Sequence, residues 1–240
     1  MSVLSVENLS KRYRGLVAVN SLSFAVPDSA IVALIGPNGA GKTTTFNLIA
    51  GMTRPDSGEI KLDGVSLNGL PPHRICDAGI ARTFQLVRPF ARLSVEENVT
   101  IGCLHRERDV GAARREARTL IERLGLAPHR LKPAATLALP DRKRLEVARA
   151  LGTRPKFLLL DEVMAGLTPN ECDEFVAFFR EINRDFRITI LLIEHIMRAV
   201  MALASHVVVL NYGEKIAEGE PAAVVRDPAV VQCYLGEDAL

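Results

Sequence analysis

The sequence predicts an α/β protein whose core is a mostly parallel β-sheet. Short, continuous apolar runs, typical of strands buried on both faces, occur at residues 31–35, 157–160 and 188–193. Segments with helical spacing separate these runs, and strands that alternate with helices favour parallel pairing. Hydrophobic residues form 48% of the 240-residue chain and charged residues 24%, a globular composition that excludes wholesale disorder.

Residues 3–26 begin the chain with a different pattern. Apolar and polar residues alternate loosely there, and Pro27-Asp28 supplies a turn. The alternation predicts half-buried antiparallel strands ahead of the buried strand at 31–35. The longest apolar runs fall far short of the ~20 residues that a membrane-spanning helix needs, so we expect a chain that does not itself cross a bilayer.

The strand at 31–35 runs directly into a glycine-rich loop, and a helical pattern follows from Lys42 to Ala50. The loop fits the phosphate-binding motif G-x-x-x-x-G-K-[ST], with the strand before it and the helix after it that the motif requires. It consists of Gly36, Pro37, Asn38, Gly39, Ala40, Gly41, Lys42 and Thr43. Its amides and the helix N-terminus favour phosphate oxygens, Lys42 can reach the β- and γ-phosphates, and Thr43 can bind Mg²⁺. The loop therefore predicts a nucleoside triphosphatase.

Residues 82–154 are expected to form a basic and mostly helical block, and the helices between Ser94 and Gly152 are predicted to be an insertion into the sheet. This segment carries 16 basic and 8 acidic residues, whereas the rest of the chain carries 14 basic and 20 acidic. Residues 113–124 have helical spacing and end at Gly125, and a second helix is predicted at 140–152. The formal net charge of the whole chain is only +2, which gives no sign of nucleic-acid binding.

The strand at 157–160 delivers two carboxylates, Asp161 and Glu162, at its end. With the phosphate loop, this pattern predicts that Asp161 faces the metal and that Glu162 orients or activates the attacking water. Thr168 and Glu171 then form a capping box that opens a helix, with Pro169 at its first position. A strand at 188–193, a helix at 196–204 and a strand at 207–210 complete the prediction.

The phosphate loop, Asp161 and Glu162 occur with three further residues in the order that is typical of the ATP-binding subunits of ABC transporters. The sequence resembles that family along essentially the whole chain. Tyr13 lies where that family places an aromatic ring that stacks on adenine. Gln85 matches the glutamine loop between the catalytic core and the helical insertion. His195 matches the switch histidine one strand beyond Asp161.

The resemblance implies an α/β fold with a P-loop, RecA-like, mostly parallel sheet, an N-terminal antiparallel β subdomain and an inserted helical subdomain. It implies one ATPase domain over residues 1–240, with residues 1–85 and 155–240 as the core and 86–154 as the helical subdomain. ATP and Mg²⁺ are the implied cofactors. The implied catalytic residues are Glu162, His195 and Gln85; the nucleotide ligands are Tyr13, the loop residues 36–43 and Thr44; the metal ligands are Thr43, Gln85 and Asp161.

Finer features resemble one branch of the family, the ATPases that import branched-chain amino acids. They are the patterns at residues 79–85, 88–90, 93–99 and 165–169 and the ending Tyr234-Leu235-Gly236. The resemblance implies the larger of two ATPase types, a heterodimer with a second ATPase subunit, two membrane permeases, an external substrate-binding protein and no nucleic acid. It also implies a peripheral position on the cytoplasmic face of the inner membrane. Importers of urea and other amides share much of the pattern.

Residues 137–141, Leu-Ala-Leu-Pro-Asp, depart from the family signature L-S-G-G-Q. Ala138 lacks a hydroxyl for the γ-phosphate, Pro140 has no N–H to donate, and Asp141 brings negative charge. In the family that this chain resembles, the signature acts on the ATP held by the partner subunit. The resemblance therefore implies one weakened ATP site and an asymmetric pair of ATPase subunits. A local rearrangement that keeps both sites active is the alternative.

The phosphate loop also fits two other classes of protein. A soluble ABC ATPase of cofactor assembly shares the same motifs and stays open as an alternative. A small GTPase is excluded, because the sequence has no N-K-x-D motif to recognise guanine.

Overall fold

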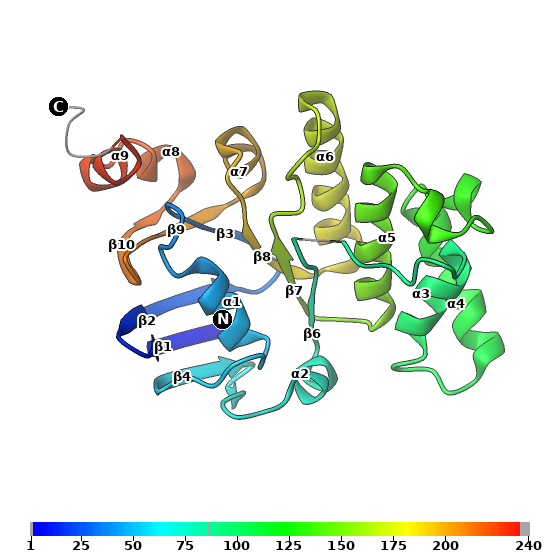
Figure 1. The fold of residues 1–240 in the computed structure, drawn as a ribbon, viewed down its shortest axis with the longest axis horizontal. Helices are drawn as coiled ribbons and strands as arrows, with labels where there is room; N and C mark the ends of the chain where they lie inside the picture. Colours follow the sequence, from blue (N-terminus) through cyan, green and yellow to red (C-terminus); the bar gives the residue numbers. More distant parts are fainter. Residues whose placement is uncertain (1, 86, 236–240) are drawn as a thin grey trace.

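The computed structural model describes residues 2–85 and 87–235 and contains a six-stranded sheet at its centre (Figure 1). Met1, Leu86 and residues 236–240, which include the Gly236 of the C-terminal pattern, lie outside the described residues. The strands follow in the spatial order β10 (Glu214–Gly219), β9 (His206–Asn211), β3 (Ile31–Ile35), β8 (Thr189–Ile193), β7 (Phe157–Asp161) and β6 (Ile80–Arg82). Every neighbouring pair is parallel except β9 and β10, which confirms the predicted sheet.

The central strands are buried on both faces, and their alternate residues enter two separate cores. On β3, Val32 and Leu34 belong to one core, whereas Ile31, Ala33 and Ile35 belong to the other. Successive side chains of a strand point to opposite faces, so a strand covered on both sides must be apolar throughout. This geometry explains the continuous apolar runs in the sequence.

An antiparallel sheet covers one face of the parallel sheet. Its spatial order is β2 (Leu16–Pro27), β1 (Ser2–Tyr13), β4 (Ser57–Leu62) and β5 (Val65–Ser66). The core between the two sheets also takes in Phe46 and Ile49 of α1 (Lys42–Ile49). The antiparallel strands predicted at 3–26 are therefore confirmed, and they lie beside the loop that precedes α1.

Helices cover the opposite face (Figure 1). They are α6 (Pro169–Phe186) and α7 (Met197–Leu203) over the sheet, with α8 (Pro221–Val224) and α9 (Pro228–Leu235) at the C-terminal end. The predicted capping box of α6 is present, because Thr168 accepts from the Glu171 amide and the Glu171 carboxylate accepts from the Thr168 amide. The sequence reasoning did not predict β5, β6, β10, α8 or α9, all of which are short or lie at the edge of the molecule.

A helical region lies at the end of the sheet farthest from α9 (Figure 1). It comprises α3 (Val95–Cys103), α4 (Val110–Arg123), α5 (Leu139–Gly152) and the single 3₁₀ turns η1 (Ala127–His129) and η2 (Ala134–Thr136). The helix expected at 140–152 begins one residue earlier. A further helix, α2 (Pro72–Ala78), precedes β6 and was not predicted.

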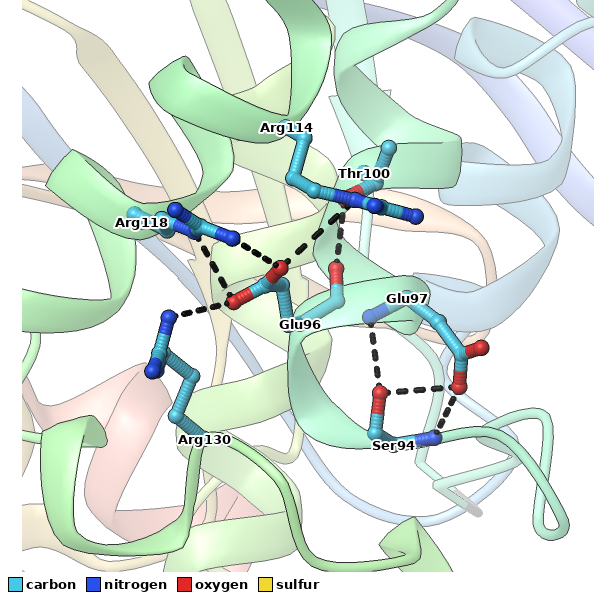
Figure 2. Close-up of polar contacts among 7 residues, drawn as sticks. All are labelled: Ser94, Glu96, Glu97, Thr100, Arg114, Arg118 and Arg130. Atoms are coloured by element: carbon cyan, nitrogen blue, oxygen red, sulfur yellow. Dashed lines mark hydrogen bonds and ion pairs between the residues drawn. The ribbon is translucent and has the colours of Figure 1, made fainter. Parts of the chain in front are cut away.

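A nearly buried carboxylate holds this helical region together (Figure 2). The Glu96 side chain on α3 accepts from Arg118 of α4 at 3.1 Å and from Arg130 after η1 at 2.8 Å, and Arg114 lies 3.6 Å away. The Arg118 hydrogen bonds hold the pKa of Glu96 below its usual range. Three of the 16 basic residues of the segment 82–154 are therefore engaged around one carboxylate.

Within residues 2–85 and 87–235, no helix has both the length and the apolar character needed to cross a bilayer.

Replacing Glu96 with glutamine keeps the shape of the side chain but removes the charge that three arginines share. We expect Glu96→Gln to lower the free energy of unfolding by about 1–3 kcal/mol near neutral pH. Folding lowers the pKa of Glu96. The contribution of this carboxylate to the free energy of unfolding of wild type is therefore present above the pKa that Glu96 has in the unfolded chain, and it is lost as the pH falls. Urea unfolding at several pH values measures this. Glu122→Gln, on the exposed side of α4, is the matched control, and an equal loss in that variant would contradict the assignment.

Candidate functional site

The carboxyl ends of four parallel strands meet at one edge of the central sheet. The glycine loop follows β3, Asp161 ends β7 and Glu162 follows it, His195 follows β8 and Gln85 follows β6. Parallel strands end at the same edge, so loops that are far apart in sequence face the same space. This edge collects the residues that the sequence analysis singled out after four different strands.

The loop between β3 and α1 is folded around backbone contacts that only glycine permits at two positions. A Cβ at Gly36 would lie 2.1 Å from the Leu210 carbonyl oxygen, and one at Gly41 would lie 2.4 Å from the Ala18 carbonyl oxygen. Gly41 is also the left-handed N-cap of α1 and supplies no side-chain cap. The first amides of α1 are therefore left to bind an anion, as expected of a phosphate loop.

Lys42 is folded back onto this loop. Its ammonium donates to the carbonyl oxygens of Gly36 at 2.7 Å and Pro37 at 2.8 Å, and the residue is only 5% exposed. Burial lowers the pKa of Lys42, and the carboxylates of Glu162 and Asp161 oppose that shift. The two carbonyl contacts are neutral and weaker than contacts to phosphate, so this ammonium can exchange them for phosphate oxygens.

Glu162, Gln85 and His195 are in direct contact. The Glu162 carboxylate accepts from the Gln85 amide nitrogen through one oxygen, and the other oxygen lies 2.7 Å from Nε2 of His195. Glu162 has a φ of 48°, a left-handed conformation that is rare outside glycine. Its backbone N–H donates to Ile193 at 2.9 Å, which joins the ends of β7 and β8. The structure thus brings together the three side chains expected to act in catalysis.

Asp161 is held by an arginine that the sequence analysis assigned no role. Arg82 at the end of β6 donates to Asp161 Oδ2 at 2.7 Å, and both side chains are less than one-tenth exposed. The same guanidinium donates to the Asn47 side chain on α1 at 2.7 Å. At the edge of the sheet where the phosphate loop lies, one carboxylate oxygen of Asp161 is therefore engaged by Arg82.

The donor set at this edge fits Mg²⁺. Thr43 offers a hydroxyl at the start of α1, Gln85 an amide oxygen and Asp161 a carboxylate, and Mg²⁺ prefers oxygen ligands of this kind with few carboxylates. Arg82 takes Oδ2 of Asp161, and among the described residues Oδ1 makes no hydrogen bond. In residues 2–85 and 87–235, no group of three or more His, Cys, Asp or Glu side chains is placed to hold a metal ion, so phosphate oxygens and water would complete the coordination.

Tyr13 lies at the end of β1, in the hairpin with β2, and is 44% exposed. The Lys11 ammonium lies 5.6 Å from the centre of its ring. The following strand passes the phosphate loop, since Ala18 of β2 approaches Gly41. The ring is thus available for stacking, and its contact with adenine stays a prediction. Thr44, expected on the α-phosphate side, is half-buried in the first turn of α1.

The departure at residues 137–141 forms the start of α5. Ala138 is the N-cap and makes no side-chain hydrogen bond, and Pro140 occupies the first turn, where its missing N–H is tolerated. Asp141 lies 3.2 Å from His129 of η1, which offsets its negative charge when the imidazole is protonated. The segment is an ordinary helix start, without the hydroxyl and amide that a signature would supply.

Two buried glutamates flank the site. Burial raises the pKa of Glu194 to about 7, although its carboxylate accepts from the Met164 amide at 2.9 Å. Burial also raises the pKa of Glu146 to about 7, and this carboxylate accepts from the Phe84 amide at 3.0 Å. Lys143, on the same helix as Glu146, has a pKa lowered by burial. The sequence showed these residues only as charges in helical or strand-end positions.

A cavity of about 810 Å³ adjoins the site on the side of the helical region. It separates α2 and the end of α1 from α3 and α5, and its wall is mostly apolar. The residues that connect it to the site are Arg82, Phe84, Gln85, Glu146 and Asp161. Phe84 is 48% exposed, so this aromatic ring is presented to whatever enters the cavity.

Comparison with known families agrees with this geometry. Residues 19–165 match the family described as ABC transporter, a span that includes the phosphate loop, Gln85 and Glu162. Residues 214–239 match the family described as branched-chain amino acid ATP-binding cassette transporter.

Similar proteins are matched along nearly their whole length. The high-affinity branched-chain amino acid transport ATP-binding protein BraF of Pseudomonas aeruginosa is 39% identical over an alignment of 251 positions, which covers 98% of this chain and 98% of BraF. The protein LivG of Salmonella typhimurium, described in the same words, is 41% identical over 251 residues, again 98% of each chain. A crystal structure of the ADP conformation of an ATP-binding cassette from an ABC transporter superposes with a TM-score of 0.90 at 30% identity, covering 99% of this chain and 100% of that chain.

The raised pKa of Glu194 predicts a pH dependence of stability. The folded protein binds this proton more tightly than the unfolded chain, so stability falls as pH rises from the unfolded value of about 4.3 through about 7. Glu194→Gln cannot ionise and can still accept from Met164. We expect the free energy of unfolding of Glu194→Gln, relative to that of wild type, to increase by about 2–4 kcal/mol between about pH 5 and about pH 8. Urea unfolding at the two pH values measures the difference, which Glu122→Gln should not show. A gain that is equal at both pH values would contradict the prediction.

Proposed function

The chain belongs to the ABC transporter family as an ATP-binding, ATP-hydrolysing subunit, and we propose that it powers the import of branched-chain amino acids. The cargo is inferred from the names of BraF and LivG and from the family match at residues 214–239. The proposed domain is residues 1–240, with a core of 1–85 and 155–240 and a helical subdomain of 86–154.

The contact of Glu162 with Gln85 and His195, opposite the phosphate loop, carries the proposed chemistry. ATP lies with its phosphates against the amides of the loop and of α1, and Lys42 moves from Gly36 and Pro37 to the β- and γ-phosphates. Thr44 contacts the α-phosphate side, and Tyr13 stacks on adenine. Thr43, Gln85 and Asp161 would hold Mg²⁺, which would supply positive charge that offsets the negative charge of the phosphates.

Glu162 acts on the attacking water. Its carboxylate orients the water and takes up its proton as the water oxygen bonds to the γ-phosphorus and the bond from that phosphorus to the leaving oxygen of ADP breaks. His195 donates to the γ-phosphate oxygens and so detects whether that phosphate is present. In the structure described here, Gln85 and His195 instead contact Glu162 itself. ATP binding must therefore separate Gln85 and His195 from the Glu162 carboxylate, so that the attacking water can bind to this carboxylate.

The cavity beside Gln85 is the proposed docking place for a membrane permease. Its mostly apolar wall, exposed Phe84 and direct connection to Gln85 and Asp161 support this assignment. A helix from a partner that enters the cavity would touch the wall of the ATP site. We propose two such permeases, a second ATPase subunit, an external substrate-binding protein and a peripheral position on the cytoplasmic face of the inner membrane.

The helix start at residues 137–141 supports an asymmetric pair of ATPase subunits. Pro140 has no N–H and Ala138 has no hydroxyl, so this segment offers the partner's γ-phosphate neither of two expected donors. The site that contains this chain's own phosphate loop is closed instead by the partner's signature. Hydrolysis therefore takes place mainly at that site.

Lys42 and Glu162 have separable effects in this scheme. Lys42→Ala should lose most nucleotide affinity, because the loop at residues 36–43 loses its only charged side chain. Glu162→Gln should bind ATP with near wild-type affinity and hydrolyse it at least about 100-fold more slowly, since only the proton acceptor is lost. Fluorescent-nucleotide binding and phosphate release by the full transporter measure the two effects. Glu171→Gln, in the remote capping box of α6, is the control. Wild-type turnover by Glu162→Gln would contradict the proposed function.

Asymmetry predicts that the same change has unequal effects in the two subunits. Two missing donors, at about 1–3 kcal/mol each, slow the site covered by residues 137–141 by roughly 10- to 10⁴-fold. Glu162→Gln in this chain should therefore abolish most ATPase activity of the complex, whereas the equivalent change in the partner subunit should remove little. This chain alone should be a poor ATPase. Equal losses in the two complexes, or rapid hydrolysis by this chain alone, would refute the asymmetry.

A further inference from the structure

Arg82 connects β6, β7 and α1 at the edge of the sheet where the phosphate loop lies. It ends β6, donates to Asp161 at the end of β7 and donates to Asn47 on α1, both at 2.7 Å. Its guanidinium lies 5.7 Å from the ring centre of buried Phe46 and 5.2 Å from that of Phe84. A buried arginine with this number of directed contacts is held in one orientation.

The contact with Asp161 is a buried ion pair. The Arg82 side chain is 9% exposed and the Asp161 side chain 7% exposed. Removing one partner of such a pair leaves an uncompensated charge, so each side chain depends on the other for its position. One atom, Nε of Arg82, is buried without a hydrogen-bond partner. The arginine therefore tolerates an unsatisfied donor in order to keep its two terminal nitrogens on Asp161 and Asn47.

We propose that Arg82 is a positioning residue that fixes the Asp161 carboxylate for the metal of the ATP site. Because Arg82 occupies Oδ2, the plane of the carboxylate is set and Oδ1 is left for the cation. The second anchor, Asn47, lies on the helix that begins with Lys42 and Thr43, so the guanidinium sets the distance between the metal-binding carboxylate and the phosphate loop. This inference rests on the proposed function, since it assumes that Mg²⁺ and nucleotide bind at this edge.

The position of Arg82 in the cavity wall extends this role to the partner. Arg82, Phe84 and Asp161 all line the cavity of about 810 Å³, and Phe84 covers one face of the guanidinium. A partner segment that displaces the Phe84 ring removes a contact of Arg82 and so loosens Asp161. Arg82 thus adds a second route from the docking cavity to Asp161, which also lines the cavity directly.

The test compares nucleotide affinity with and without metal, so it does not depend on turnover. A fluorescent, non-hydrolysable ATP analogue is titrated into the purified full-length chain in EDTA and in saturating Mg²⁺. Lysine keeps the charge of Arg82 but cannot reach Asp161 and Asn47 together. We expect Arg82→Lys to reduce the Mg²⁺-dependent gain in affinity by about tenfold or more, as is usual for groups that orient a metal ligand. Its affinity in EDTA should stay within about twofold of wild type, since the phosphate loop is unchanged.

Two further variants separate positioning from general stability. Asn47→Ala removes only the second anchor of Arg82 and should give a smaller loss of the same sign. Arg154→Lys is the control, because Arg154 likewise pairs with a carboxylate, that of Glu116, through two nitrogens at 2.6 and 2.7 Å. Arg154 lies away from the site, so the metal dependence of nucleotide affinity in this variant should match wild type. Thermal unfolding establishes that each variant is folded at the assay temperature.

Each outcome has one interpretation. A folded Arg82→Lys with the wild-type gain from Mg²⁺, or with a larger gain, overturns the proposal, and the larger gain would mean that Arg82 competes with the metal. A similar loss in Arg154→Lys also overturns it, because the effect would then follow from lost stability. If wild type binds no nucleotide under either condition, the proposed function itself fails, which is distinct from both results.

Discussion

The parallel register of β3, β8 and β7 is the constraint on which the site depends. Because the three strands are paired in parallel, the phosphate loop, His195 and Glu162 emerge at one edge. The strands are buried on both faces by two cores, so a one-residue shift of register would move each side chain into the opposite core and disrupt the packing of both. The packing that stabilises the fold thus also sets the distances between residues that are more than 100 positions apart in the chain.

Low exposure gives the charges at this edge their strength. Lys42, Asp161, Arg82 and Glu194 are each nearly removed from water, where electrostatic interactions are stronger and an unpartnered charge is costly. In the structure described here, Lys42 is held by carbonyl oxygens, Asp161 by Arg82, and Glu162 by Gln85 and His195. Every charge that ATP and Mg²⁺ would meet already has a partner, so nucleotide binding is an exchange of partners at a preformed edge.

The sequence predicted the parts of this arrangement that are local. The phosphate loop, the buried strands and the α6 capping box depend on neighbouring residues, and all three are found where they were expected. Contacts between distant residues leave no local pattern. Arg82 and Asp161 are 79 positions apart, and nothing in the sequence shows that these two side chains meet. The strand β6 has only three residues, too few for a detectable period, and the edge strand β10 alternates too weakly to be recognised.

A crystal structure of the Glu162→Gln variant with Mg²⁺ and an ATP analogue shows whether nucleotide exchanges the partners of these charges. We expect the Lys42 ammonium to leave the carbonyl oxygens of Gly36 and Pro37 for phosphate oxygens. We also expect that Gln85 and His195 no longer contact residue 162 and that Arg82 stays on Asp161. Nucleotide bound away from the glycine loop, or bound there with Lys42, Gln85 and His195 unmoved, would contradict this exchange.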